Sequence, residues 1–370
     1  MKPLVVMLAN AGHQPGDTRI FEKEALTLAE AGYQVRLIIP TKESYRANNV
    51  DIIAVPPPNN GFEKLVNAPW RVFRAALKQP ATAWFHLHDS ELLVIGLLLR
   101  LLGRSVVYDA HEDTPRQIAY QHWIPWYLKK PYALFYFLLE RLCGLVFNGI
   151  IVAEPVIARH YPKSKTILIR NFPKLESFRR PQPVPFVHRK RQLVYVGLLS
   201  EPRGFSVMME AVELARQKID FTLVLGGKFS PASLQEKLPA HPGIKYLSWV
   251  PYEKLPDLLY ESQVGIIVPQ PNPRYLTNYP VKLFEYMAAG LAVIASAQGE
   301  ASQFVSEANA GVLADPGNPQ AIADAIVSLF TNPEEAEQMG ERGRKLVFEK
   351  YNWASEAGKL VEWYRSMFKK

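Results

Sequence analysis

Residues 278–296 decide the fold, and they read Asn-Tyr-Pro-Val-Lys-Leu-Phe-Glu-Tyr-Met-Ala-Ala-Gly-Leu-Ala-Val-Ile-Ala-Ser. A polar loop with a proline leads into a helix, the helix ends at Gly290, and an apolar strand follows. Lys282 and Glu285 lie three positions apart, on one helix face near its N-terminus. The free backbone N–H groups there can hold an anion, Lys282 adds a positive charge, and Glu285 can accept hydrogen bonds from a diol. A solvated lysine and an ordinary helix carboxylate fit the same pattern.

The same succession of helix and strand extends in both directions along the chain. Short β-branched apolar runs alternate with longer helical stretches, which is typical of parallel, doubly wound sheets. The predicted strands are 4–8, 34–39, 51–55, 84–87, 105–108, 149–152, 166–169, 192–196, 221–225, 244–246, 264–268, 292–295 and 311–313. The predicted helices include 19–31, 91–102, 206–217, 252–262, 282–289 and 319–331. We therefore expect an α/β fold with one parallel sheet in each half of the chain.

The length of 370 residues is too great for one ordinary hydrophobic core and suits two domains. Between residues 172 and 192, prolines and clustered basic residues interrupt the periodic patterns, as they do in linkers. We predict a first domain over 1–185, a second over 186–352 and a final helix within 353–370. Ligands of open α/β sheets bind at the carboxyl ends of the strands, so we expect the site in a cleft between the two domains.

The composition is that of an ordinary globular protein, with 48% hydrophobic and 21% charged residues. The single cysteine, Cys143, cannot form an internal disulfide, and no apolar run reaches the length of a membrane span. Residues 1–9 fit a first strand better than a signal peptide, so we expect a cytoplasmic protein. Residues 1–185 hold 23 lysines and arginines against 15 aspartates and glutamates, whereas residues 186–370 hold 20 of each. The net charge of +8 therefore lies in the first half, which we expect to meet an anionic partner.

His86 and His88 lie on the same face of one predicted strand. Together with Asp89, Asp109 and His111 they imitate the ligand set of a metal-dependent hydrolase. Such histidine pairs more often cap a strand and bind backbone groups, and the pattern of the whole chain is not that of a metal-dependent barrel. We therefore predict no metal site.

The segment 122–141 gathers aromatic side chains around two lysines in the basic half of the chain. This composition suits a membrane interface, with rings at the depth of the headgroups and cations on anionic lipid. A core helix that follows a proline-broken loop fits equally well. The candidate membrane contacts are Trp123, Trp126, Lys129 and Lys130. Interleaved basic and aromatic residues also occur in proteins that bind single strands, but no recognised nucleic-acid module is present, and we expect no nucleic-acid partner.

Several stretches, taken in order along the chain, resemble the retaining family 4 glycosyltransferases of GT-B fold. The helix and strand at 278–296 resemble the donor-sugar segment of that family. Further matching stretches are 16–20, 29–35, 86–89, 108–112, 196–204, 224–227 and 247–251. The resemblance spans about the whole chain. It implies two Rossmann-like doubly wound domains that face each other across a cleft, with the final helix crossing back to the first domain.

The resemblance also implies an activity, the transfer of a hexose or N-acetylhexosamine from a nucleotide-diphosphate sugar with retention of the anomeric configuration. A UDP-sugar is the favoured donor, with no metal or other cofactor. The first domain of the family builds the acceptor side, so we expect a glycan or lipid-linked acceptor. Together with the positive charge of the first half, this predicts a peripheral enzyme of cell-envelope polysaccharide biosynthesis on the inner face of the plasma membrane.

Individual residues take roles from the same resemblance. The glutamate that matches Glu285 binds the ribose hydroxyls in the family, and the histidine that matches His111 lies near the anomeric carbon. Arg203 and Lys282 would stabilise the departing diphosphate, and with His111 they are the expected catalytic residues. The implied donor-binding residues are Gly16, Arg203, Gly226, Val250, Tyr279, Lys282 and Glu285. The implied acceptor-side residues are Asp17, Arg19 and His88.

Two positions depart from the pattern of the family. Thr277 stands where many members carry a glutamate, and Leu198 stands where an arginine often follows the glycine. These two departures suggest one alternative, a non-catalytic, membrane-associated partner in polysaccharide assembly. A nucleotide-sugar epimerase of the same fold, which would need no acceptor groove, is another. Transfer or hydrolysis of a nucleotide sugar by the purified protein would separate the transferase from both.

Overall fold

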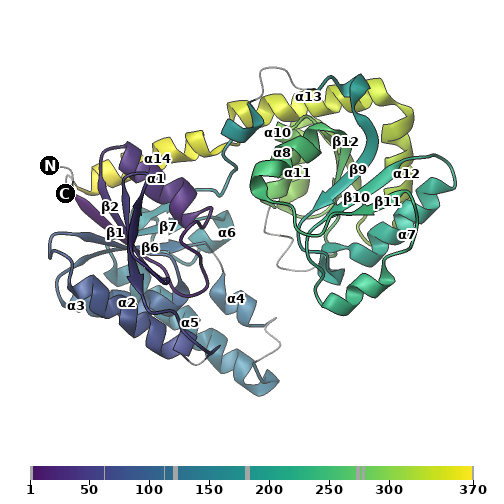
Figure 1. The fold of residues 1–370 in the computed structure, drawn as a ribbon. Coiled ribbons are helices and arrows are strands. Elements are labelled where there is room, and N and C mark those ends of the chain that lie inside the picture. Colours follow the sequence, from purple (N-terminus) through teal and green to yellow (C-terminus); the bar gives the residue numbers. More distant parts are fainter. Residues whose placement is uncertain are drawn as a thin grey trace. The chain divides into compact units, whose positions relative to one another are not determined.

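The computed structural model describes residues 3–61, 63–111, 113–119, 124–179, 184–271, 276 and 280–368. It divides the chain into two compact units (Figure 1). Unit 1 comprises Met1–Asn171 together with Trp353–Lys370, and unit 2 comprises Phe172–Asn352. The division lies before the predicted boundary at residue 185, because Phe172 and Phe178 are buried in the hydrophobic core of unit 2.

Unit 1 is built on an eight-stranded sheet in the order β3-β4-β2-β1-β5-β6-β7-β8. Every neighbouring pair is parallel except β3 and β4. The order of the strands reverses between β1 and β5, which is where open α/β sheets bind ligands. The strands are β1 (Leu4–Leu8), β2 (Gln34–Pro40), β3 (Tyr45–Ala47), β4 (Val50–Val55), β5 (Trp84–Leu87), β6 (Ser105–Ala110), β7 (Gly149–Val152) and β8 (Thr166–Leu168).

Helices cover both faces of this sheet (Figure 1). Because side chains alternate along a strand, Val6 and Phe85 point to one face and Val5 and Val35 to the other. The first face packs on α2, α3 and α5, and the second on α1, the preceding π-helical turn and α14. The helical segments are Ile20–Ala25 (π-helical), α1 (Leu26–Glu30), α2 (Ala68–Leu77), α3 (Leu93–Leu101), α4 (Thr114–Ile118), α5 (Trp126–Val146), α6 (Pro155–Ala158) and α14 (Trp353–Met367).

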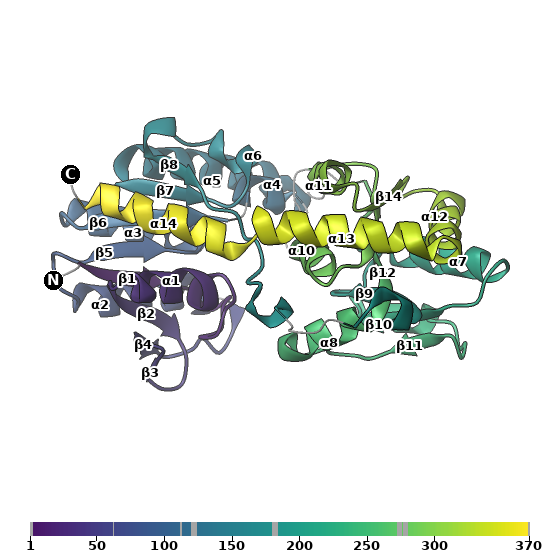
Figure 2. The ribbon, with the colours of Figure 1, turned by 90° about the horizontal axis from the view of Figure 1, so that it is seen from above.

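The final helix, α14, is part of the hydrophobic core of unit 1, although it lies at the far end of the sequence. Figure 2 shows it running across the sheet. Trp353, Leu360 and Tyr364 are buried beside Val107 of β6. The indole Nε1 of Trp353 donates to the hydroxyl of Thr27 at 2.9 Å, and the Tyr364 hydroxyl lies 2.9 Å from Nδ1 of His86. Unit 1 is therefore completed by the last helix of the chain.

Unit 2 contains six parallel strands in the order β11-β10-β9-β12-β13-β14. Its helix α10 ends before Gly290, which has a φ of +72°, and the fully buried strand β13 follows. The strands are β9 (Lys190–Val196), β10 (Thr222–Gly226), β11 (Ile244–Tyr246), β12 (Ser262–Ile267), β13 (Ala292–Ser296) and β14 (Gly311–Ala314). The helices are α7 (Phe205–Arg216), α8 (Leu255–Tyr260), α10 (Val281–Ala288), α11 (Glu300–Ala308), α12 (Pro319–Thr331) and α13 (Pro333–Glu349). Among the helices that the structure describes, none is both long enough and apolar enough to cross a membrane.

Candidate active site

The polar centre of unit 1 is an ion pair between Arg19 and Asp109. Both N–H···O contacts of the guanidinium with this carboxylate measure 2.7 Å, so the pair is bidentate, and both side chains are buried. Burial alone would raise the pKa of Asp109, but the Arg19 guanidinium outweighs it and holds that pKa well below its usual range. Arg19 therefore holds the carboxylate of Asp109 in a fixed position near the end of β6.

Two histidines share that carboxylate. Nδ1 of His88 and Nδ1 of His111 each lie 3.4 Å from Oδ2 of Asp109. Burial opposes the protonation of His111, but the neighbouring Asp109 outweighs it and raises the pKa of His111. For His88 burial dominates and lowers the pKa. The site therefore favours a cationic His111 beside a neutral His88.

A second histidine–carboxylate cluster lies next to the first. His13 places Nδ1 at 2.9 Å from Asp17 and Nε2 at 2.9 Å from Asp89. Burial lowers the pKa of His13, but the two carboxylates overcome this effect and raise it to about 10. At neutral pH both ring nitrogens therefore donate. The sequence did not single out His13, and its position four residues before Asp17 was the one available signal.

These groups border a cavity of about 310 Å³ within unit 1. Its polar wall includes His13, His88, Asp89 and His111, all of which follow or end a strand near the point where the strand order reverses. Its other wall comes from α4, α5 and the residues between them, and it carries Ile118, Ile124, Tyr132 and Tyr136. Arg19, predicted on the acceptor side, is buried and does not line the cavity. The cavity offers polar groups for hydroxyls and flat apolar surfaces for a ring or chain.

Glu24, His86 and His88 form a buried group whose potential ligand atoms lie within 4.8 Å of one another. Burial and the nearby Asp109 raise the pKa of Glu24 well above its usual range, and burial lowers that of His86. The guanidinium of Arg19 already lies 3.2 Å from Glu24, so a metal dication there would meet a positive charge. The suspected set of His86, His88, Asp89, Asp109 and His111 is also divided, because Asp89 faces His13.

In unit 2, the loops after β9 and β10 approach each other through glycine. Gly197 and Gly227 have φ values of +141° and +138°. A Cβ at Gly227 would overlap the carbonyl oxygen of Gly197, and a Cβ at Gly197 would meet the ammonium group of Lys282. The side chain of Val250 lies against Gly226 at the end of β10. Side chains are excluded at these points, and the backbone can come close to a ligand.

Lys282 and Arg203 converge on the Gly197 loop from two different helical segments. A Cβ at Gly197 would lie 3.4 Å from Nη1 of Arg203, and the Lys282 ammonium lies 4.1 Å from the centroid of the Tyr195 ring. Burial and the positive charge of Arg203 lower the pKa of Lys282 to about 7, although Glu285 acts in the opposite direction. Lys282 at the start of α10 and Arg203 in the short helical turn before α7 thus place two basic side chains against one loop.

Glu285 lies one turn further along α10 and is only 8% exposed. Its neighbour is Tyr252, whose pKa is raised by burial and by a hydrogen bond to Glu285. Tyr252 is a site residue that the sequence analysis missed, since an isolated tyrosine after a proline carries no distinctive signal. Predicted donor residues Arg203, Gly226, Val250, Lys282 and Glu285 all lie at one end of the unit 2 sheet.

Tyr279 and Trp123 lie outside the described residues. Gly16 is exposed in unit 1, and a Cβ there would meet no atom within 4 Å. Unit 1 by itself therefore gives no steric reason for a glycine at this position.

The two α/β units, with cationic and acidic groups at the carboxyl ends of their parallel strands, define a GT-B protein. Solved structures share this architecture. Sucrose-phosphate synthase from Thermosynechococcus elongatus superposes with a TM-score of 0.77 at 20% identity over the full length of both chains. Anabaena Alr3699/HepE in complex with UDP and glucose gives 0.73 at 13% identity, over 98% of this chain and 100% of that one.

Sequence comparison supports a glycosyltransferase. Residues 178–346, which lie within unit 2, match the model described as "Glycosyl transferases group 1". The MMP α-(1→4)-mannosyltransferase of Mycolicibacterium hassiacum is 28% identical over 167 residues, 44% of this chain and 39% of that protein. The lipopolysaccharide 1,2-N-acetylglucosaminetransferase of Salmonella typhimurium is 30% identical over 190 residues, 48% and 49% of the two. The chain spans about half the length of the curated relatives it matches.

Proposed function

We propose that this chain is a retaining glycosyltransferase that moves a hexose or N-acetylhexosamine from a nucleotide-diphosphate sugar. The convergence of Lys282 and Arg203 on the Gly197 loop carries the donor part of the proposal. Two cations beside the free N–H groups of a helix start make a site for a diphosphate. Glu285, one turn along the same helix, supplies oxygens that accept hydrogen bonds from ribose hydroxyls.

A UDP-sugar is the favoured donor. This preference is supported by the Anabaena structures described as complexes with UDP and with UDP-glucose, which share the fold of this chain. The relatives named as transferases of mannose and N-acetylglucosamine support a hexose or an N-acetylhexosamine as the transferred group.

The residues of the chain divide the chemical work. When the bond between the sugar and the diphosphate breaks, negative charge grows on the diphosphate oxygens, and Lys282 and Arg203 stabilise it. These cations supply the charge that a metal ion would otherwise provide, so metal-independent departure is part of the proposal. His111 donates a hydrogen bond to the donor sugar. Arg19 acts as a positioning residue, because it fixes the carboxylate of Asp109 against His111.

The acceptor binds on unit 1. We assign it to the cavity beside His88 and His111, where Tyr132 and Tyr136 provide flat apolar surfaces for a glycan or a lipid-linked sugar. Peripheral attachment to the inner face of the plasma membrane completes the proposal. It is supported by the positive charge of residues 1–185 and by the exposed side chains of Trp126 and Lys130, whereas Lys129 donates to the carbonyl of Ala119.

A thermal-shift screen with UDP-, GDP-, ADP- and dTDP-sugars tests the donor, because a ligand that binds the native state raises its melting temperature. We expect the largest shift with a UDP-sugar. The cognate donor must then be consumed when membrane or glycan acceptors are added. Absence of a shift with every nucleotide sugar would overturn the proposal.

A further inference from the structure

The outer face of α5 is apolar where a surface helix is normally polar. The helix turns Tyr136, Glu140, Cys143 and Gly144 into unit 1. Five large apolar side chains at helical spacing point the other way, with exposures between 47% for Leu142 and 67% for Leu145. They are Leu134, Phe135, Leu138, Leu142 and Leu145. A helix that is apolar on both sides needs a second apolar environment.

The end of α3 extends this apolar face. The guanidinium Nε of Arg100 donates to the backbone carbonyl of Val146 at 3.0 Å, which fastens the last turn of α3 to the last turn of α5. Leu101 and Leu102, the two residues that follow, are 82% and 58% exposed. We call these two leucines and the five outward residues of α5 the α3–α5 outer face.

The charges of this face have one sign. Lys130 and Arg141 are exposed on α5 between the apolar side chains, and Lys165 donates to the carbonyls of Leu145 and Phe147 at the end of the helix. Residues 93–104 contain no carboxylate. The only carboxylate of α5 is Glu140, which is buried, and burial together with the nearby Asp113 raises its pKa to about 8. At neutral pH the face is therefore apolar and cationic.

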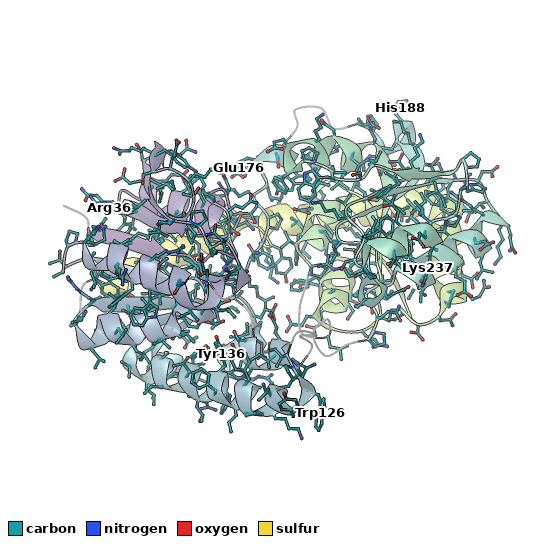
Figure 3. All side chains as sticks on the ribbon, turned by 60° about the horizontal axis from the view of Figure 1, so that its bottom comes forward. Arg36, Trp126, Tyr136, Glu176, His188 and Lys237 are labelled. Atoms are coloured by element: carbon teal, nitrogen blue, oxygen red, sulfur yellow. The ribbon has the colours of Figure 1, made fainter. Side chains whose placement is uncertain are left out.

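The first turn of α5 carries exposed aromatic side chains that suit an interface between water and lipid. Trp126 and Tyr127 at the first turn are 84% and 62% exposed, and Figure 3 shows Trp126 at the end of the helix. Indole and phenol rings prefer the depth of lipid headgroups, because they carry an apolar body and one polar group. Exposed aromatic rings at one end of a helix with an apolar, cationic face are typical of helices that lie in the plane of a membrane surface.

We propose that the α3–α5 outer face docks unit 1 on an anionic lipid bilayer. Charge selects this occupant over a second copy of the chain. A symmetric dimer through this face would bring Lys130 and Arg141 against the same cations, with no carboxylate on the face to pair with them. Anionic headgroups neutralise the cations, while the leucines and Phe135 enter the boundary of the acyl chains.

Docking of this face on a bilayer would bring a membrane-bound acceptor to unit 1. The docking itself is argued independently of the proposed transferase activity, and only its role in presenting the acceptor rests on that activity. Tyr132 and Tyr136 come from the inner side of α5 and line the cavity in unit 1. The cavity therefore lies one helix away from the bilayer. A sugar carried on a membrane lipid reaches it with a short linker, without the lipid leaving the membrane.

Cosedimentation with vesicles tests the proposal. Vesicles of phosphatidylglycerol and of phosphatidylcholine are compared, using the full chain and the variant Leu138→Gln/Leu142→Gln. Both substitutions replace exposed side chains with a good helix former, so we expect the melting temperature to be unchanged. A matched control, Val187→Gln/Leu247→Gln, removes two exposed apolar side chains from unit 2. The native chain and the control should pellet with phosphatidylglycerol, less so at high salt and with phosphatidylcholine, whereas the α5 variant should partition at least about tenfold less.

Three results would overturn the proposal. In the first, the native chain stays in the supernatant with phosphatidylglycerol vesicles at low salt. In the second, the folded Leu138→Gln/Leu142→Gln variant pellets to the same extent as the native chain. In the third, sedimentation velocity without lipid shows a dimer that the α5 variant abolishes, which would assign the face to a second copy. Vesicle binding is measured without any nucleotide sugar, and donor binding is measured without vesicles. Failure of the docking face and failure of the transferase activity are therefore distinguishable.

Discussion

The ammonium group of Lys282 lies 4.1 Å from the centroid of the Tyr195 ring, on the loop side of α10. A ring face attracts a cation more weakly than a carboxylate does, so this contact leaves most of the charge of Lys282 available. Burial and Arg203 bring the pKa of Lys282 down to about 7. An anion bound at the Gly197 loop would favour the charged form of Lys282 and raise its pKa, and the proposed binding of the donor diphosphate depends on this interaction.

Lys282→Met and Arg203→Met should reduce turnover more than donor affinity. The charge on the diphosphate grows as the sugar departs, and an interaction that strengthens in the transition state acts mainly on kcat. We expect each variant to lower kcat about 100-fold or more, by analogy with removal of a single charge-stabilising donor. Steady-state kinetics and calorimetric donor affinity decide the matter. A loss confined to affinity, with kcat intact, would reduce both residues to positioning contacts.

Donor affinity should fall as the pH rises above 7. The free protein holds Lys282 with a pKa of about 7, and a bound diphosphate raises that pKa, so binding takes up a proton in this range. The decrease should be at most about tenfold for each pH unit, and Lys282→Met should remove it. Calorimetry in buffers of different ionisation enthalpy measures the proton uptake, and equal uptake by the variant would contradict the assignment.

The lowered pKa of Lys282 affects the stability of the unliganded protein in the direction opposite to its effect on donor affinity. The pKa of Lys282 is lower in the folded chain than its usual value of 10.5, so between pH 7 and 10.5 the unfolded chain binds more protons at this residue. The contribution of Lys282 to stability therefore rises with pH across this window. The contributions of Lys282 to ligand affinity and to folding stability should therefore respond to pH in opposite directions.

Gly227→Ala should disturb the donor loop. A Cβ there would overlap the carbonyl oxygen of Gly197, and the φ of +138° is unfavourable for any L-residue with a side chain. We expect a loss of about 1–3 kcal/mol in stability and a weaker affinity for UDP. Gly103→Ala is the control, because Gly103 has a φ of +75° but nothing within 4 Å of an added Cβ. Equal effects of the two substitutions on UDP affinity would show that close approach of the loops is irrelevant.

Much of the fold is readable from the sequence because short apolar runs between helices leave few alternatives. The ranges 4–8, 84–87, 149–152 and 244–246 are strands with the predicted bounds. The short antiparallel strand Tyr45–Ala47 was not predicted, since its three residues are mostly exposed and carry no apolar pattern. The sequence of the segment 122–141 is compatible both with a core helix and with a membrane-interface helix, and α5 has features of each. α5 has a buried side, as a core helix does, and an apolar exposed side, as an interfacial helix does.

The candidate site was predictable where a motif lies on one continuous segment. Lys282 and Glu285 belong to one helix, and their spacing alone places them on one face. The contact of His13 with Asp89 could not be predicted, because Asp89 is 76 residues away and the contact exists only once β1 and β5 are neighbours. The burial of Arg19 was missed for the same reason, since its bidentate partner Asp109 lies 90 residues further along the chain.

The central claim is that α10 of unit 2 binds the nucleoside diphosphate of the donor, with Glu285 accepting hydrogen bonds from the ribose. Titration of UDP into the native chain and into Glu285→Ala, followed by calorimetry, tests it most directly. A hydrogen bond to a charged group contributes roughly 1.5–3 kcal/mol, so the account predicts a Kd raised about tenfold or more in a variant that stays folded, with a lower melting temperature because Tyr252 loses its partner. A folded Glu285→Ala variant that binds UDP with unchanged affinity would contradict it.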